Sequence, residues 1–411
     1  MTEQTQDTIV IVGGGMTGGL LALLLAQQGL AVTVLDGAPE PQFPQGDAQL
    51  RVSTLTEASY HLLCHAGAWQ HLDPARLQPY QAMQVWDQDG TGEVNFNAAE
   101  VGSDSLGWLV ENGHLTAALY RAGEALDNLD WRCQATVEQL QRHGDGWQVH
   151  SGGQVFEADL LVGADGARSL VRESAGISAG PRASGHHALV ATIATAEPHG
   201  GCARQVFMES GPLALLPLFG DGHRCSIVWS GWPALIEELR ALPPEAFVAR
   251  LQGACGEALG AVTLVSERPC FPIEERHASQ YVARALALVG DAAHVIHPLA
   301  GQGVNLGLLD AGVLAEEVAR MRGAGRGCAD PQGLARYQRR RRGENLLMQN
   351  AMRGFKALFE RREMPLRLLR NTGMRWVNGA APVRRFFIQQ ALGRGGDLPA
   401  LARASGRQAP H

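Results

Sequence analysis

The sequence lacks any long hydrophobic run, and its most apolar stretch, residues 19–26, is far too short to cross a bilayer. No basic segment followed by a small-residue cleavage site precedes it, so we expect no secretory signal and a cytoplasmic protein. The net charge is only −6 at pH 7 over 411 residues, which argues against general attraction to nucleic acid. Internal repeats and low-complexity tracts are also lacking.

No CxxC pair occurs, and the seven cysteines are odd in number and widely spaced. We therefore expect reduced, buried thiols rather than a disulfide framework. His61, Cys64 and His65 lie close together in the chain, but no further ligand is paired with them. His294 and His297 lie three residues apart, and packing or hydrogen bonding beside a cofactor accounts for them better than a metal. The sequence predicts no metal site.

Charge is unevenly distributed along the chain. Residues 336–395 contain 15 Lys and Arg against 3 acidic residues, whereas the rest of the chain contains 20 against 38. Basic helices with interleaved apolar residues can contact an anionic membrane surface or an acidic partner. Two alternatives stay open for these arginines: the run at 339–342 is a solvated helix face, or the basic side chains pair with the acidic remainder of the chain.

Residues 8–36, TIVIVGGGMTGGLLALLLAQQGLAVTVLD, read as a strand, a glycine turn, a helix and a second strand. Gly13 permits the tight turn, Gly15 leaves room for a pyrophosphate, and Gly18 lets helix and strand approach closely. The helix N-terminus offers N–H groups to the phosphates. Asp36 closes the second strand and can accept a hydrogen bond from a ribose hydroxyl. The complete unit predicts a dinucleotide site, without separating FAD from NAD.

Two later segments also place glycines directly after apolar strands: GADG at 163–166 and GDAAHVIHPLAGQGVNLG at 290–307. Because strand carboxyl ends face the ligand crevice of an open α/β sheet, we expect all three segments to lie side by side along one elongated cofactor. Backbone N–H groups at residues 301–305, at a helix start, suit a ring edge that gains negative charge on reduction.

The trio GxGxxG, DG and GD resembles the single-component flavin-dependent aromatic hydroxylases. Within that class, residues 290–307 are similar to the hydroxylases of ubiquinone biosynthesis, and LRVSTL, VENGHL, HHALVATIATAEPH and GPLALLPL are similar to the VisC-type 2-polyprenylphenol hydroxylases. The likeness covers roughly residues 8–402. It departs at Gly113, where the family usually carries a larger residue.

The resemblance implies an α/β fold: a Rossmann-like FAD-binding domain of the aromatic-hydroxylase type, an inserted β-sheet substrate domain and a helical C-terminal region. The expected boundaries are 1–72, 106–181 and 273–335 for the FAD-binding domain, 73–105 and 182–272 for the substrate domain, and 336–411 for the helical basic region. The segment GPLALLPL of the inserted sheet is expected to form an apolar wall for a prenylated ring.

The resemblance also implies a monooxygenase that uses FAD and O2, through a flavin C4a-hydroperoxide, to hydroxylate the ring of a polyprenylated phenol. NAD(P)H or another electron donor would visit transiently. Asp291 would contact the ribityl chain, Pro298 would lie near the ring, and Asn305 would close the loop. Arg51 and His297 are the candidate catalytic side chains, although the cofactor carries the difficult step.

The expected FAD-binding residues come from all of these segments. They are Gly13, Gly15, Gly18, Asp36, Arg51, Asn112, Asp165, Asp291, Pro298, Gly301, Gln302, Gly303, Val304 and Asn305. Two other functions stay open: a flavin oxidase or prenyl-chain reductase on the same fold, and a non-catalytic flavin-binding subunit of a quinone-biosynthesis complex. Peripheral contact with the inner membrane, or with such a complex, is a further expectation from the basic region.

Overall fold

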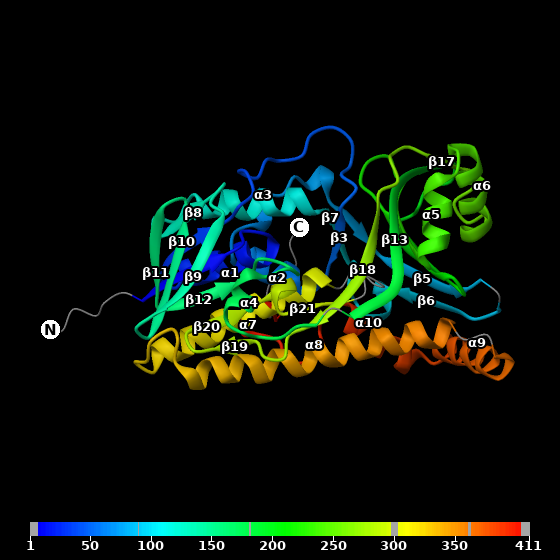
Figure 1. The fold of residues 1–411 in the computed structure, drawn as a ribbon. Coiled ribbons are helices and arrows are strands. Elements are labelled where there is room, and N and C mark those ends of the chain that lie inside the picture. Colours follow the sequence, from blue (N-terminus) through cyan, green and yellow to red (C-terminus); the bar gives the residue numbers. More distant parts are fainter. Residues whose placement is uncertain (1–6, 89, 181, 297–302, 361–362, 404–411) are drawn as a thin grey trace.

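The computed structural model describes residues 7–88, 90–180, 182–296, 303–360 and 363–403. Two large sheets lie side by side, and the long helix α8 (Pro331–Glu360) runs beneath both of them (Figure 1). The expected α/β architecture, with an inserted sheet and a helical C-terminal region, is confirmed.

The first sheet has six strands, mostly parallel, in the order β19-β20-β12-β1-β2-β8. Its strands are β1 (Thr8–Val12), β2 (Ala31–Leu35), β8 (Leu129–Arg132), β12 (Leu160–Gly163), β19 (Val282–Ala283) and β20 (Leu286–Leu288). They share one apolar core with helices α1 (Met16–Ala26), α2 (Glu57–His65), α3 (Asn112–Gly123) and α7 (Gly303–Gly323), and with the antiparallel strands β9 (Val137–His143), β10 (Gly146–Ser151) and β11 (Gln154–Ala158). Burial on both faces explains why these strands are almost continuously apolar.

Strands β1, β12 and β20 are neighbours, with Val12 opposite Gly163 and Gly163 opposite Leu288. The three glycine segments that follow these strands therefore emerge at the same edge of the sheet, as the sequence predicted. The third of them begins with the short turn η4 (Gly290–Ala292) and strand β21 (His294–Val295).

The second sheet is almost entirely antiparallel, in the order β21-β18-β13-β16-β15-β14-β5-β6, with β17 added beside β13. Its long strands are β5 (Ala82–Asp87), β6 (Glu93–Asn97), β13 (Arg182–Thr195), β14 (Cys202–Met208), β15 (Gly211–Pro217), β16 (Arg224–Gly231) and β18 (Cys270–His277), and β17 spans Val262–Leu264. Helices α5 (Pro233–Ala241) and α6 (Pro244–Cys255) cover its outer face.

A small sheet of β3 (Val52–Leu55), β7 (Gly107–Glu111) and β4 (Gln78–Tyr80) lies between the two large sheets. Arg51 therefore directly precedes strand β3, and the next helix along the chain is α2. The C-terminal helices α8, α9 (Met364–Gly379) and α10 (Ala381–Ala391) close the other side, where Phe359 stacks on Phe207 with ring centroids 3.9 Å apart.

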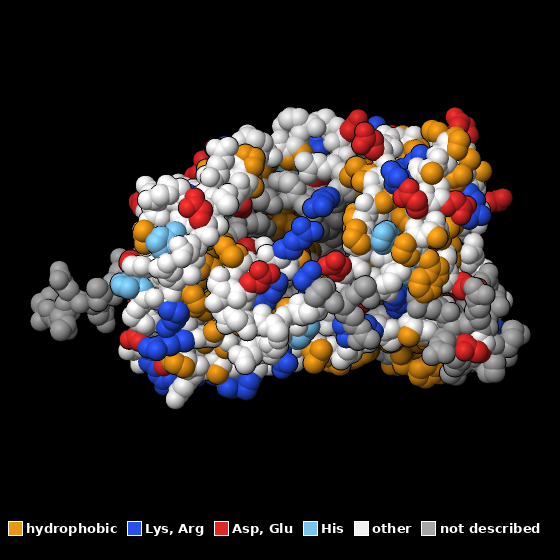
Figure 2. All heavy atoms as spheres, in the orientation of Figure 1, with side chains coloured by type: hydrophobic (Ala, Val, Ile, Leu, Met, Phe, Trp, Pro, Cys, Tyr) orange, Lys and Arg blue, Asp and Glu red, His pale blue; other side chains and the backbone are white. Residues whose placement is uncertain are grey.

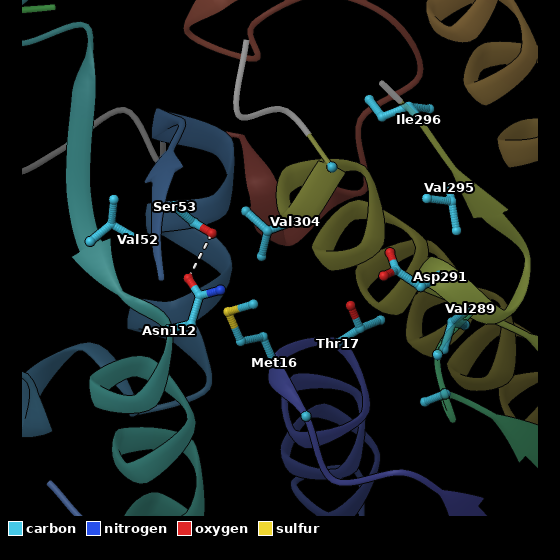
Figure 3. A pocket seen from close by; sticks show the side chains of 14 residues that line it. Met16, Thr17, Val52, Ser53, Asn112, Val289, Asp291, Val295, Ile296 and Val304 are labelled. Carbon is cyan, nitrogen blue, oxygen red and sulfur yellow. Dashed lines mark hydrogen bonds between the residues drawn. The ribbon is translucent and has the colours of Figure 1, made fainter. Parts of the chain in front are cut away.

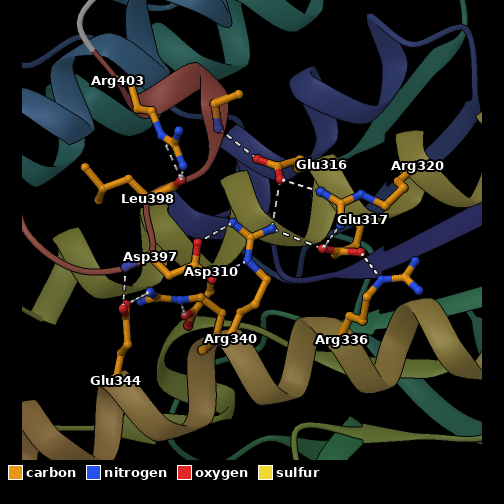
Figure 4. A network of polar contacts seen from close by, with 12 residues as sticks. Asp310, Glu316, Glu317, Arg320, Arg336, Arg340, Glu344, Asp397, Leu398 and Arg403 are labelled. Carbon is orange, nitrogen blue, oxygen red and sulfur yellow. Dashed lines mark hydrogen bonds and ion pairs between the residues drawn. The ribbon is translucent and has the colours of Figure 1, made fainter.

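Much of the basic C-terminal region is paired with acidic residues. Arg340 contacts Glu316 and Glu317 of α7, and its guanidinium also pairs with Asp397 (Figure 4). Other pairs join Arg336 to Glu317, Arg341 to Asp310, Arg353 to Glu275, Arg384 to Glu100 and Arg394 to Glu57. For these arginines pairing within the chain is confirmed, because each guanidinium lies within hydrogen-bonding distance of a carboxylate of the same chain. None of the described helices is both long and apolar enough to pass through a bilayer.

Candidate flavin site

The glycine turn after β1 is shaped by close backbone contacts. Gly13 has a positive φ of +100°, and a Cβ there would lie 2.4 Å from the carbonyl oxygen of Ala164. A Cβ on Gly18 would lie 2.0 Å from the carbonyl oxygen of Gly13. Gly15 differs, since nothing lies within 4 Å of a Cβ built on it. Two glycines are therefore required by packing, and the third leaves open space.

That open space belongs to a cavity of about 400 Å³ at the carboxyl edge of the first sheet (Figure 3). All three glycine segments contribute to its wall, together with β3 and the start of α3. Its lining residues are Gly15, Met16, Thr17, Val52, Ser53, Asn112, Ala164, Gly166, Val289, Asp291, Val295, Ile296, Gly303 and Val304. Most of these side chains are small or apolar, so a flat ring can lie against them.

Asp36 stands at the end of β2 and organises the glycine turn. Its Oδ2 accepts the backbone N–H of Gly14 at 2.7 Å, and its Oδ1 accepts that of Ala38 at 2.8 Å. A carboxylate has about four lone-pair sites, so two remain for a ribose hydroxyl. The structure thus assigns Asp36 a role in the turn itself, which the sequence did not predict.

The two other predicted carboxylates occupy different environments. Asp165 accepts the backbone N–H of Val171 at 3.1 Å, at the start of α4 (Leu170–Ser174), and burial raises the pKa of its carboxyl group. Its Oδ1 is buried and has no hydrogen-bond partner among the described residues. Asp291 lies in the cavity wall on η4, where it is exposed to the cavity. Restricted solvation raises the pKa of its carboxyl group, and nearby His294 opposes this effect.

Asn112 lies in the cavity wall despite the unusual glycine that follows it. The hydroxyl of Ser53 donates to its Oδ1 at 2.7 Å, and the amide nitrogen points toward the cavity (Figure 3). The backbone N–H of Asn112 donates to the carbonyl of Arg51 at 3.0 Å. The Arg51 side chain is exposed and is not part of the described cavity wall.

The structure describes only part of the segment 290–307. His297, Pro298, Gly301 and Gln302 lie outside the described residues. Gly303 and Val304 line the cavity at the start of α7. The side chain of Asn305 instead binds the β3–α2 region through three hydrogen bonds. Its Nδ2 donates to the carbonyl of Thr54, and its Oδ1 accepts from the backbone N–H of Thr56 and from the hydroxyl of Ser59.

Several wall residues were missed from the sequence. Thr17 sits inside the GxGxxG segment, and its Oγ1 would lie 2.9 Å from a Cβ on Gly290. Ser53 lies in LRVSTL, the segment for which only Arg51 was named. Their position within one or two residues of a named motif residue was the signal that could have identified them as wall residues. Among the described residues no group of three or more His, Cys, Asp and Glu side chains is placed to hold a metal ion.

Comparison with known proteins gives a consistent result. The model of the FAD binding domain family matches residues 6–350. The chain is 40% identical over 395 residues to 3-demethoxyubiquinol 3-hydroxylase of Escherichia coli, covering 96% of this chain and 100% of that protein. It is 37% identical to ubiquinone hydroxylase UbiL of Rhodospirillum rubrum, covering 94% and 89% of the two chains. A PqsL variant from P. aeruginosa superposes with a TM-score of 0.77 at 26% identity, over 90% of this chain and 99% of that one.

Proposed function

This chain belongs to the FAD-binding hydroxylase family of ubiquinone biosynthesis, and from that premise we propose that it hydroxylates the aromatic ring of a polyprenylated phenol. The observation that carries the proposal is the cavity where the three glycine segments meet. Its open side at Gly15 and its apolar wall suit an extended dinucleotide that ends in a flat ring.

The residues present fit FAD. The glycine turn and the start of α1 offer N–H groups to a pyrophosphate, and a carboxylate at Asp291 can accept from a ribityl hydroxyl. When bound, FAD would supply the oxygen chemistry: one atom of O2 would enter the ring and the other would leave as water, with two electrons coming from a donor such as NAD(P)H. The protein's own task is to bind, to orient the substrate and to exclude water.

We propose that the aliphatic part of the cavity wall excludes water. Val52 lines it from β3, Val295 from β21 and Val304 from α7, and Val289 and Ile296 line it from the connecting segments directly before η4 and after β21. Figure 2 shows a hollow on one face of the molecule, between the two halves, with basic side chains at its edge. We propose that the substrate ring enters between the flavin cavity and the inner face of the second sheet.

The segment GPLALLPL forms β15, and fewer of its residues than expected can contribute to an apolar wall for the substrate. Leu213 and Leu215 point to the outer core beneath α5 and α6. Leu216 points the other way and packs against the same apolar cluster as Val52, which lines the cavity. Because side chains alternate along a strand, only alternate residues of this segment can face a substrate.

The peripheral membrane contact is proposed for the α9–α10 pair rather than for the run at 339–342. Trp376, Phe386 and Phe387 are exposed there, by 64%, 56% and 36% of their surface, beside the exposed Arg375 and Arg385. Aromatic and basic side chains together suit the anionic surface of the inner membrane, reached from the cytoplasm. A quinone-biosynthesis protein complex is the alternative partner.

The function is tested in two steps. Purified enzyme, a nicotinamide donor, a short-chain prenylphenol and ¹⁸O2 should yield a ring-hydroxylated product that carries one ¹⁸O atom. A strain that lacks the protein should accumulate the corresponding precursor, and the wild-type gene should remove it. A reduced prenyl chain without ¹⁸O would indicate a reductase. Normal quinone synthesis from a Gly15→Val variant that binds no FAD would indicate a non-catalytic subunit.

A further inference from the structure

Asp310 lies in the middle of α7, completely buried, and one of its oxygens closes the turn that carries Asp291. Its Oδ2 accepts the backbone N–H of Gly290 at 3.1 Å and lies 2.5 Å from Nε2 of His294. Gly290 precedes Asp291 and His294 follows it by three residues. A single carboxylate oxygen therefore forms hydrogen bonds at both ends of the segment 290–294, which carries Asp291 in the cavity wall.

The other oxygen binds the C-terminal helix. Oδ1 of Asp310 accepts from Nε of Arg341 at 2.7 Å and from Nδ2 of Asn345 at 3.0 Å, both on α8. Arg341 is also completely buried, and it donates to Glu344 at 2.8 Å. Burial alone would raise the pKa of Asp310, but His294 and Arg341 outweigh it and lower this pKa to about 2. The carboxylate is thus held in its charged form.

The turn has little freedom on its opposite side. Gly290 has a positive φ of +58°, and a Cβ there would approach Oγ1 of Thr17 to 2.9 Å. Thr17 lines the cavity at the start of α1. Asp291 is therefore placed by a turn that is held between the start of α1 and the Asp310 carboxylate.

We propose that Asp310 is a positioning residue for the flavin site and that Arg341 positions Asp310. Neither residue lines the described cavity wall, so both act through Gly290 and His294. On this proposal α8, the first helix of the basic region, helps to position the cofactor site. The inference uses the proposed function only in requiring that the protein binds FAD.

The test is the affinity of the apoprotein for FAD, measured by quenching of flavin fluorescence below the unfolding temperature. Arg341→Gln and Asp310→Asn are each expected to weaken FAD binding at least about tenfold and to change the visible circular dichroism of the remaining bound flavin. The matched control is Arg340→Gln, one residue away on the same helix. It removes ion pairs to Glu316, Glu317 and Asp397, so it should lower the Tm but leave the Kd for FAD within about twofold.

Two results would overturn the proposal: wild-type FAD affinity in folded Arg341→Gln, or an equal loss of affinity in Arg340→Gln. If the single variants fold poorly, Asp310→Asn combined with Arg341→Met removes both buried charges and is expected to fold better. That double variant should still bind FAD at least about tenfold more weakly, and normal affinity in it would overturn the proposal. Failure of the wild type itself to bind FAD would instead contradict the proposed function.

Discussion

Oδ1 of Asn305 accepts the backbone N–H of Thr56 at 3.0 Å, although the two residues are 249 positions apart. The same side chain accepts from Ser59 and donates to the carbonyl of Thr54. It therefore joins the start of α7 to the β3–α2 connection, next to the cavity. In this structure the Asn305 side chain therefore stabilises the packing of the elements around the flavin site.

Asn305→Ala should destabilise the apoprotein by about 2–4 kcal/mol, because it leaves buried hydrogen-bonding groups without partners. Urea unfolding of the apoprotein measures the effect, with Val304→Ala as the control that changes the cavity wall instead. A large loss of FAD affinity with unchanged apoprotein stability would show that Asn305 acts on the cofactor directly.

Gly15→Val should abolish FAD binding while leaving the apoprotein folded. The new side chain would extend into open cavity space, since nothing lies within 4 Å of a Cβ at this position, and that is where the pyrophosphate is expected. Gly18→Ala is the contrasting variant, because its Cβ would clash with the backbone of Gly13 and should lower the Tm. Equilibrium dialysis and thermal melts separate the two effects, and normal FAD binding by folded Gly15→Val would be decisive against the assignment.

Asp291→Asn should weaken FAD binding by about 1.5–3 kcal/mol if the carboxylate accepts a ribityl hydroxyl. In the apoprotein, by contrast, the raised pKa of Asp291 predicts that the same variant increases stability. A carboxyl whose pKa is higher in the folded state destabilises the fold when it is charged, so the variant should melt higher than wild type at neutral pH. The difference should shrink as the pH falls through this raised pKa and vanish below about 3.9, the unfolded value. Melting curves from pH 3 to 8 test this, and a lower Tm at neutral pH would contradict it.

Arg51→Ala should leave FAD affinity nearly unchanged and raise the share of reducing equivalents lost as H2O2. The reason is its placement: the backbone of Arg51 supports Asn112 in the cavity wall, whereas its side chain is exposed and lies outside the described wall. Arg168→Ala, another exposed arginine, serves as the control. The ratio of H2O2 to hydroxylated product measures coupling, and normal coupling in Arg51→Ala would leave Arg51 with only a backbone role.

Trp376→Ala combined with Phe386→Ala should abolish flotation with anionic liposomes at low salt, since both side chains are exposed on the α9–α10 pair. Wild type should float at low salt and less at high salt, because the neighbouring arginines are screened. Val155→Ser, at an exposed apolar position on β11, is the matched control and should float normally. Wild-type protein that stays in solution but co-purifies with other quinone-pathway proteins would favour the complex instead.

The sequence by itself determined the parts of the site that depend on local geometry. Gly13 and Gly18 are required where backbone approaches backbone, and the strand, turn and helix around them follow from short-range patterns. Three glycine segments after three apolar strands were also enough to predict that they meet, because parallel strands end at a common edge. The α/β fold and the FAD-binding family follow from these features.

Only the tertiary structure decided which partners the buried polar side chains bind. Asn305, Asp310 and Arg341 each bind partners tens to hundreds of positions away, and nothing in their local sequence specifies those partners. The same holds for β15, where pairing with its neighbours decided which alternate residues enter the core beneath α5 and α6 and which point to the opposite face. A buried polar group must be satisfied by whatever the fold brings within hydrogen-bonding distance, and that distance exists only once the elements have packed.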